Sequence, residues 1–144
     1  MGGRIRTFLI TNMILCIDYD VVSHTYGKWL FDLDTFQFYE QNSEDTEFLT
    51  NYLPFPTVSD YECKKAFLDK LNSIKKIPHR LIELLDKDFE FWFWNIVDDG
   101  DERLNEFDRF EKKYSVNAIT KWCSENNIPY YIDKSDDLLM YFLR

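Results

Sequence analysis

The pattern of apolar and polar positions predicts a β-hairpin in the first third of the chain. Trp29, Phe31 and Leu33 alternate with a second set of side chains, and Phe36 and Phe38 do the same after a two-residue connection. A period of two places alternate side chains on one face of a strand. We therefore expect a hairpin with one buried aromatic face.

Two amphipathic helices are predicted after a break marked by Pro54 and Pro56. Ser59 and Glu62 have the spacing of a capping box, in which the serine hydroxyl accepts a backbone N–H of the first helical turn. The helix that follows has an apolar stripe made of Ala66, Phe67, Leu71 and Ile74. A second helix is expected to begin near Pro78 and to bury Leu81, Ile82 and Leu85.

The last third of the chain is dominated by one long helical pattern. Apolar positions recur every three or four residues from Leu104 to Trp122, and Asn126 and Asn127 end the pattern. Before this helix, residues 89–97 are mostly apolar, so periodicity does not decide between a helix and a strand there.

Shorter segments complete the set of predicted elements. Residues 13–17 form a strand or the start of a helix, residues 129–132 form a strand, and residues 138–143 form an apolar element of either type. Residues 41–47 are polar and acidic, as is typical of a loop. Together the elements predict an α+β fold, in which a small antiparallel hairpin or sheet packs with about four helices.

Length and charge limit the kind of protein that this chain forms. The 144 residues suit one domain, and residues 1–12 are interpreted as an extension before an alternative start at Met13. Acidic residues outnumber basic ones 26 to 17, which gives a net charge of −9. Because negative charge is repelled by phosphate backbones and anionic lipids, we expect neither direct nucleic-acid binding nor membrane association.

The cysteines indicate a reducing compartment. Cys16, Cys63 and Cys123 are few and far apart, and the sequence has no Cys-x-x-Cys. This spacing fits neither a disulfide framework nor a zinc site, so we interpret the three residues as inert thiols. The apolar stretch after Arg4 and Arg6 is short and lacks the small-x-small site of a signal peptide. We therefore expect a cytoplasmic protein without a cofactor.

Two Asp-x-Asp sequences suggest an enzymatic alternative. Asp18 and Asp20 follow an apolar run, as in the first motif of haloacid-dehalogenase-type phosphatases, where the first aspartate is the nucleophile and the second an acid/base beside Mg²⁺. Asp32 and Asp34 resemble the same motif without its glycine. Asp136 and Asp137 resemble the late acidic pair, but no apolar strand leads directly into them. We interpret the paired aspartates as solvated side chains at strand ends.

The other polar motifs carry weaker signals. Residues 98–102 are rich in acids but lack the spacing of an EF-hand loop, so we interpret them as the cap of a helix. His24 and His79 have no partner at the spacing of metal ligands. The sequence thus predicts no metal site, and the protein is expected not to be an enzyme.

The aromatic cluster at residues 89–94 is the leading candidate for an interaction site. Neither a helix nor a strand buries side chains on all sides, so we expect one or two of these rings to be exposed. Exposed tryptophan is typical of binding hot spots, and nearby acids would steer a basic partner. The predicted interface consists of Phe91, Trp92, Trp94, Asp98, Asp99, Asp101 and Glu102.

The segment Ala118-Ile-Thr-Lys-Trp-Cys-Ser-Glu-Asn-Asn-Ile128 resembles a family of small acidic bacterial proteins, uncharacterised protein family 0158. The hairpin at 29–40 and the helix from Ser59 occur in the same order in that family. The family has F-R-R-F where this chain has Phe91-Trp-Phe-Trp94. The resemblance implies an order of elements and a bacterial or phage-like origin, but it implies no activity.

Charge and aromatic content together favour a non-enzymatic, acidic protein-binding module. Such a module acts as an inhibitor, an immunity protein or a nucleic-acid mimic that occupies a basic surface of another protein. One alternative is a small Mg²⁺-dependent phosphatase that uses Asp18 and Asp20. Another is a structural or regulatory subunit that associates through its aromatic face.

Overall fold

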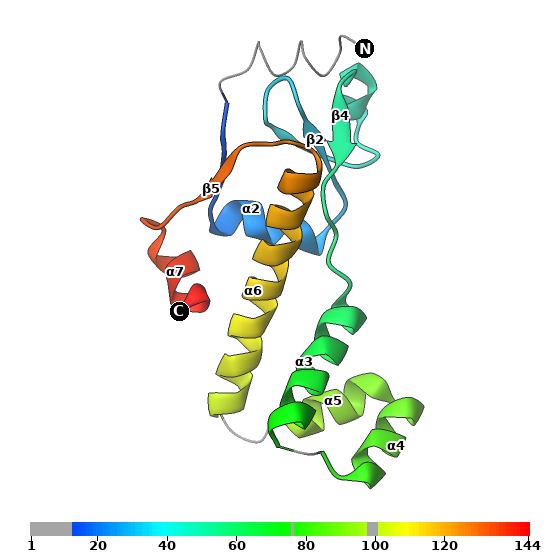
Figure 1. Cartoon of the computed structure of the whole chain (residues 1–144). Helices are drawn as coiled ribbons and strands as arrows, with labels where there is room; N and C mark the ends of the chain where they lie inside the picture. The colour runs from blue at the N-terminus through cyan, green and yellow to red at the C-terminus, as the bar shows by residue number, and fades with distance from the viewer. Residues whose placement is uncertain (1–12, 76, 98–100) are drawn as a thin grey trace.

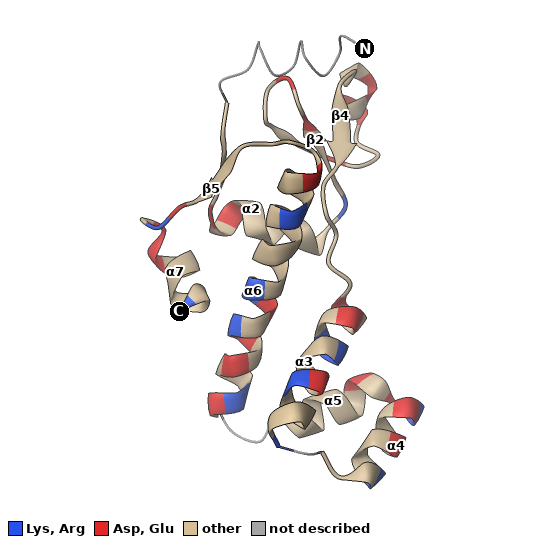
Figure 2. Cartoon of the chain, viewed as in Figure 1, with Lys and Arg blue, Asp and Glu red and all other residues tan. Residues whose placement is uncertain are grey.

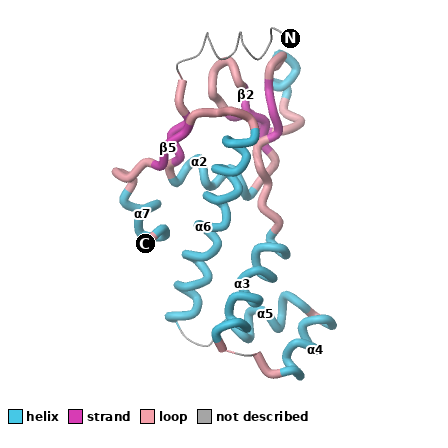
Figure 3. The backbone as a smooth tube through the Cα atoms, in the orientation of Figure 1, coloured by secondary structure: helices cyan, strands magenta, loops and turns pink. Residues whose placement is uncertain are grey.

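The computed structural model describes residues 13–75, 77–97 and 101–144. The strands gather at one end of the molecule, and three helices form the other end (Figures 1 and 3). In chain order the elements are β1 (Leu15–Ile17), α2 (Tyr19–Ser23), the 3₁₀ helix η1 (His24–Tyr26), β2 (Trp29–Asp32), β3 (Phe38–Glu40), the 3₁₀ helix η2 (Glu44–Phe48), β4 (Tyr52–Pro54), α3 (Asp60–Ile74), α4 (His79–Lys87), α5 (Phe89–Val97), α6 (Asp101–Glu125), β5 (Tyr130–Ile132) and α7 (Asp137–Leu143).

Helix α6 connects the two ends of the molecule (Figure 1). Its early residue Phe107 packs among the helices, whereas Ile119 and Cys123 pack beneath the strands. The helix ends where Asn127 adopts a φ of 56° and the N–H of Ile128 donates to the carbonyl of Cys123 at 2.9 Å. This is the left-handed cap that asparagine tolerates, and it explains why the Asn-Asn pair ends the helix.

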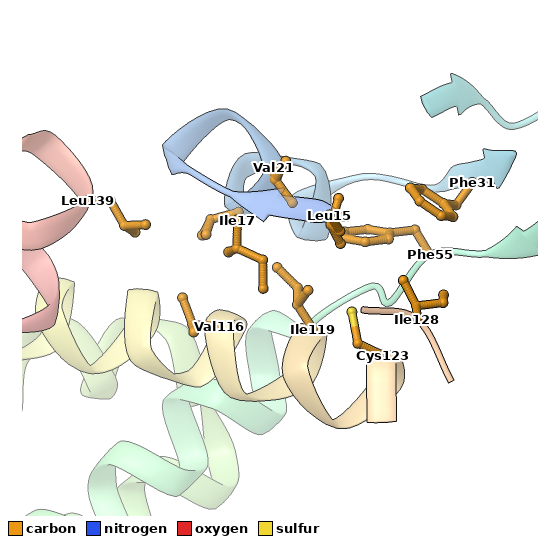
Figure 4. Close-up of a cluster of buried hydrophobic side chains, with 11 residues drawn as sticks. Leu15, Ile17, Val21, Phe31, Phe55, Val116, Ile119, Cys123, Ile128 and Leu139 are labelled. Carbon is orange, nitrogen blue, oxygen red and sulfur yellow. The ribbon is translucent and has the colours of Figure 1, made fainter. Parts of the chain in front are cut away.

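The first hydrophobic core lies between α6 and the strands (Figure 4). Strands β1 and β5 pair in parallel, with Leu15 opposite Tyr130 and Ile17 opposite Ile132. Leu15 and Ile17 point toward α6 and are buried. The buried residues of this core are Leu15, Ile17, Val21, Val22, Phe31, Phe55, Val116, Ile119, Cys123, Ile128 and Leu139.

A three-stranded antiparallel sheet with the order β3-β2-β4 covers one side of this core. Phe31 in its central strand is completely buried. The Phe31 ring lies edge-on to Trp122 of α6 at 5.3 Å and to Phe38 of β3 at 5.2 Å. The expected aromatic face of the hairpin is therefore present, and it packs directly on the long helix.

A buried carboxylate holds the turn between β2 and β3. Asp32 accepts hydrogen bonds from the backbone N–H of Asp34 at 2.8 Å and from the hydroxyl of Thr35 at 3.0 Å. Phe36 adopts a φ of 57°, and its N–H donates to the carbonyl of Asp32 at 2.7 Å. The interpretation of Asp32 as a solvated aspartate is wrong, because the turn needs its side chain as an acceptor.

The second hydrophobic core lies among α3, α5 and the first half of α6. The Ser59 hydroxyl accepts the N–H of Glu62 at 3.2 Å and so caps α3, as the sequence predicts. Helix α4 packs against α5 and contributes no fully buried side chain. The buried residues of this core are Phe67, Leu68, Phe93, Ile96, Val97 and Phe107.

The structure confirms the α+β fold and corrects several of its parts. The described residues form six helices rather than about four, because α2 and α7 are short additional helices. Strand β4 was not expected at the Pro54 break. Ile74 and Ile82, predicted to be buried, are exposed: Ile74 is the last residue of α3, and Ile82 belongs to α4, which has no fully buried residue. No helix in the described ranges is long and apolar enough to cross a membrane.

Candidate functional site

Helix α5 turns one face to the second core and the opposite face to solvent. Phe93, Ile96 and Val97 are buried, whereas the side chains of Phe91 and Trp94 are 57% and 40% exposed. Residues three positions apart lie on the same side of a helix, so the two exposed rings are neighbours. The helix therefore presents a small aromatic surface that the protein itself does not cover.

The exposed rings line an open hollow of about 440 Å³, together with Glu90 and Asn95. Trp94 is held in place from the core side, because its ring lies edge-on to Phe93 at 5.1 Å and to Phe107 at 5.8 Å. A second hollow of about 300 Å³ shares Asn95 and lies between α3, α4, α5 and the start of α6. Asn95, near the end of α5, thus borders both hollows.

A buried lysine fixes the acidic side chain at the edge of the first hollow. Nζ of Lys64 lies 2.7 Å from a Glu90 oxygen, 2.8 Å from an Asp60 oxygen and 4.9 Å from the centroid of the Trp94 ring. Burial lowers the pKa of Lys64, but the hydrogen bonds and charges of Asp60 and Glu90 outweigh it, and the net shift is upward. Glu90 is therefore already paired within the protein.

The predicted acidic rim lies only partly within the described residues. Asp98 and Asp99 fall outside them, and so does the cation site that was weighed for the same segment. Asp101 is the first residue of α6, but its side chain is also outside the description. Glu102 is exposed in the first turn of α6, and Trp92 is half-buried. The aromatic part of the predicted interface is thus better defined than its acidic part.

The aspartates of the phosphatase alternative meet at the carboxyl end of the parallel strand pair. Asp18 caps α2, because its Oδ1 accepts the N–H of Val21 at 2.9 Å, and Asp20 is exposed in the first turn of that helix. Asp136 follows β5 and accepts the N–H of Tyr19 at 2.8 Å. Strand β5 ends at Ile132, so no strand leads directly into Asp136, but the parallel pairing of β5 with β1 brings Asp136 beside the start of α2.

The carboxylates of Asp18 and Asp136 accept hydrogen bonds from backbone N–H groups. Hydrogen bonds from Tyr19 and Leu139 hold the pKa of Asp136 below its ordinary value. In residues 13–75, 77–97 and 101–144, no three His, Cys, Asp or Glu side chains are grouped as they would be to hold a metal ion. No catalytic step through a metal is derived for these residues.

The two histidines lie in different parts of the molecule. The His24 ring of η1 stacks on Phe38 at 4.3 Å and lies edge-on to Trp29 at 4.5 Å. His79 begins α4 on the surface, where Nε2 lies 3.2 Å from a Glu83 oxygen. Their surroundings are those of a packed ring and of a surface side chain beside a carboxylate.

All three cysteines are free, as expected. Burial raises the pKa of the Cys63 thiol to about 12 and that of Cys123 to about 11. Both thiols therefore stay protonated at neutral pH, which makes them poor nucleophiles. Cys16 is half-buried on the face of β1 that points away from α6.

A buried polar layer on α6 separates the two cores, and the sequence pattern did not predict it. Thr25 and Ser115 are completely buried and hydrogen-bonded at 3.1 Å. Lys112 is also buried, with Nζ 4.9 Å from the centroid of the Phe142 ring and 5.4 Å from that of Tyr26. In the sequence, Lys112 and Ser115 stand at the helical spacing of the apolar stripe. Because both are polar, they are easily interpreted as exposed to solvent.

The second missed feature is an aromatic side chain directly after the acidic segment, residues 41–47, that was predicted to be a loop. The 3₁₀ helix η2 begins in that segment and ends at Phe48, whose side chain is exposed. In the sequence, Phe48 is a single phenylalanine that follows several acids, and it belongs to no periodic apolar pattern from which a helix or strand could be predicted.

The comparisons with family models, curated proteins and solved structures found no match to this chain. The resemblance of residues 118–128 to uncharacterised protein family 0158 stays a prediction.

Proposed function

We propose that this protein is a non-enzymatic, acidic protein-binding module whose anchor is the exposed face of α5. The observation that supports the proposal is the pair of exposed rings, Phe91 and Trp94, beside an open hollow on a helix that is otherwise packed into a core. Aromatic side chains that fill a partner's pocket bury a large area at a small cost in conformational entropy. An inhibitor or immunity protein acts in this way, by occupying a surface of its target.

The two rings have different roles in this proposal. Trp94 packs on Phe93 and Phe107, so its orientation is fixed before a partner arrives. The Phe91 ring lies edge-on to its neighbour Trp92, at 5.0 Å between centroids, and is the more exposed of the two rings. A preordered anchor loses little entropy on binding. The net charge of −9 favours a partner with a basic surface.

The test uses Phe91→Ser, which removes the more exposed ring and leaves the packed Trp94 in place. Wild-type and variant proteins are used to capture proteins from a lysate of the source organism at low and high salt. A partner that the wild type retains should then bind the purified variant about tenfold more weakly or worse. Thermal unfolding of Phe91→Ser should match the wild type.

Two results would contradict the proposal. One is a lysate in which no protein distinguishes the wild type from Phe91→Ser. The other is a dimer that light scattering detects in the wild type but not in the variant, because this would identify a structural subunit that binds its own copy. A partner released at high salt would support charge-steered binding.

The phosphatase is a second candidate, because the parallel strand pair brings Asp18 and Asp136 to one end of the sheet. In this hypothesis Asp18 is the nucleophile and Asp20 the acid/base. The expected result is hydrolysis of a phosphate ester that Asp18→Asn abolishes. Activity that survives Asp18→Asn would contradict the hypothesis, and activity would also displace the binding proposal as the main function.

A further inference from the structure

The 3₁₀ helix η2 presents an aromatic side chain that belongs to neither core. Phe48 is 83% exposed, the largest exposed fraction of any large hydrophobic side chain in the described ranges. It is the last residue of η2 and packs against neither hydrophobic cluster. Single exposed apolar residues are common on protein surfaces, so exposure alone identifies no site. The surroundings of Phe48 distinguish it from such residues.

Three exposed acids precede Phe48 in the same short helix. They are Glu44, Asp45 and Glu47, and the part of the chain that the structure describes gives none of them an ion pair. Glu90 beside the α5 hollow differs in this respect, because it is paired with Lys64. The acids around Phe48 therefore keep their charge available to a partner.

The backbone holds this element in one conformation. Asn42 adopts a φ of 71°, and the N–H of Ser43 donates to the carbonyl of Glu40 at 3.2 Å. The N–H and the hydroxyl of Thr46 both donate to the carbonyl of Ser43, at 3.2 and 2.7 Å. The N–H of Leu49 then donates to the carbonyl of Thr46 at 3.2 Å. Phe48 is thus presented by a hydrogen-bonded turn, which lowers the entropy that binding would cost.

We infer that η2 is a docking element for a protein whose surface has an apolar pocket bordered by lysine or arginine. Phe48 would fill the pocket, and Glu44, Asp45 and Glu47 would face the basic border. Anionic lipid headgroups and nucleic-acid phosphates would be repelled by the same three carboxylates, so a basic protein surface is the partner that the charges favour.

This inference goes beyond the proposed function, because it concerns a different surface. Strand β4, which directly follows η2, lies at the strand end of the molecule, whereas α5 lies at the helical end (Figure 1). Acidic residues are distributed over both ends (Figure 2). The two surfaces can therefore be tested separately.

The probe is a library of random 12-residue peptides selected for binding to the complete chain. Peptides are kept when they also bind Phe91→Ser, so that the α5 surface does not contribute. We expect these peptides to combine lysine or arginine with a large apolar residue. Phe48→Ser should weaken their binding by about tenfold or more, and Phe48→Tyr should restore most of it.

The same peptides test the role of the three acids, and an unfolding measurement tests whether Phe48→Ser keeps its fold. The triple variant Glu44→Gln, Asp45→Asn and Glu47→Gln should slow their association and reduce its dependence on salt. Unfolding of Phe48→Ser should match the wild type, because the side chain is outside both cores. The inference is wrong if the selected peptides lack basic residues, if they bind Phe48→Ser as tightly as the wild type, or if the selection yields none. None of these outcomes depends on Phe91.

Discussion

The two hydrophobic cores are assembled from differently separated parts of the chain. The first core joins residues from Leu15 to Leu139, so both ends of the described chain must meet before it closes. The second core uses residues between Phe67 and Phe107, most of them on helices that follow one another directly. Contacts between distant residues cost more loop-closure entropy and form more slowly. The first core thus depends on the complete fold, while the second depends mainly on local helix packing.

The two cores also differ in how readily the helices and strands around them are expected to open locally. Helix α4 has no fully buried residue, and the helices of the second core carry the exposed Phe91 and Trp94. Elements with few buried apolar contacts open locally at lower free energy than the whole protein. The candidate binding face is therefore attached to the part of the molecule that we expect to open first.

The largest predicted effect comes from removing one buried ring from each core. Phe31→Ala and Phe93→Ala both delete a fully buried phenylalanine, and each should lower the free energy of unfolding by about 3–5 kcal/mol. Phe31→Ala should destabilise the complete chain. Phe93→Ala should expose the amides of α4 and α5 while those of β2 stay protected.

Hydrogen exchange measured on both variants tests this prediction. A single cooperative transition with equal loss of protection in α5 and β2 for both variants would show that the two cores unfold as one unit. Phe91→Ser is the matched control for Phe93→Ala, because it changes the same helix on its solvent side and should alter exchange little.

A smaller and pH-dependent effect on stability is expected at Asp136, which links α2 to α7 through hydrogen bonds. Asp136 accepts N–H groups of Tyr19 and Leu139, and these bonds lower its pKa in the folded protein. A lowered folded pKa adds stability above the unfolded value of about 3.9, and that stability is lost as the pH falls through the folded value. Asp136→Asn should therefore be less stable than the wild type at pH 7.

The same difference should shrink toward pH 3, because below about 3.9 the unfolded carboxylate takes up a proton while the lowered pKa of the folded one resists protonation. Urea unfolding at both pH values measures it, with Asp137→Asn as the control because Asp137 is exposed and adjacent. A deficit of equal size at pH 7 and pH 3 would show that the carboxylate charge has no role. No such pH dependence is expected from Ser59→Ala in the second core, since the α3 cap is neutral.

Elements with a clear period were predictable from the sequence, and elements defined by distant contacts were not. The capping serine and the long apolar stripe predicted α3 and α6, because both signals are local. Helix α5 stayed undecided because its apolar residues obscure the period, although Asp88 accepts the N–H of Phe91 at 3.3 Å in its first turn. Strand β4 was missed because it has three residues and ends in Pro54.

The candidate site was predictable only in part, for a related physical reason. The sequence indicated that some rings of residues 89–94 had to be exposed, and Phe91, Trp92 and Trp94 were named, but without the helix the half-buried position of Trp92 could not be predicted. The structure selects Phe91 and Trp94. Phe48 gave no signal, because its exposure follows from a turn whose hydrogen bonds are made by the backbone. The binding role of all three residues stays a prediction.

The parallel pairing of β1 with β5 has a consequence for synthesis on the ribosome. Leu15 and Ile17 leave the exit tunnel early, yet their strand partner is Tyr130–Ile132. The nascent chain can bury Phe67 and Phe93 against Phe107 before that partner has left the exit tunnel. At ~5–20 residues per second, translating the residues between Phe107 and Ile132 takes about 1–5 s. During this interval the apolar residues of β1 lack their native cover and depend on chaperones or on the emerging helices to stay out of aggregates.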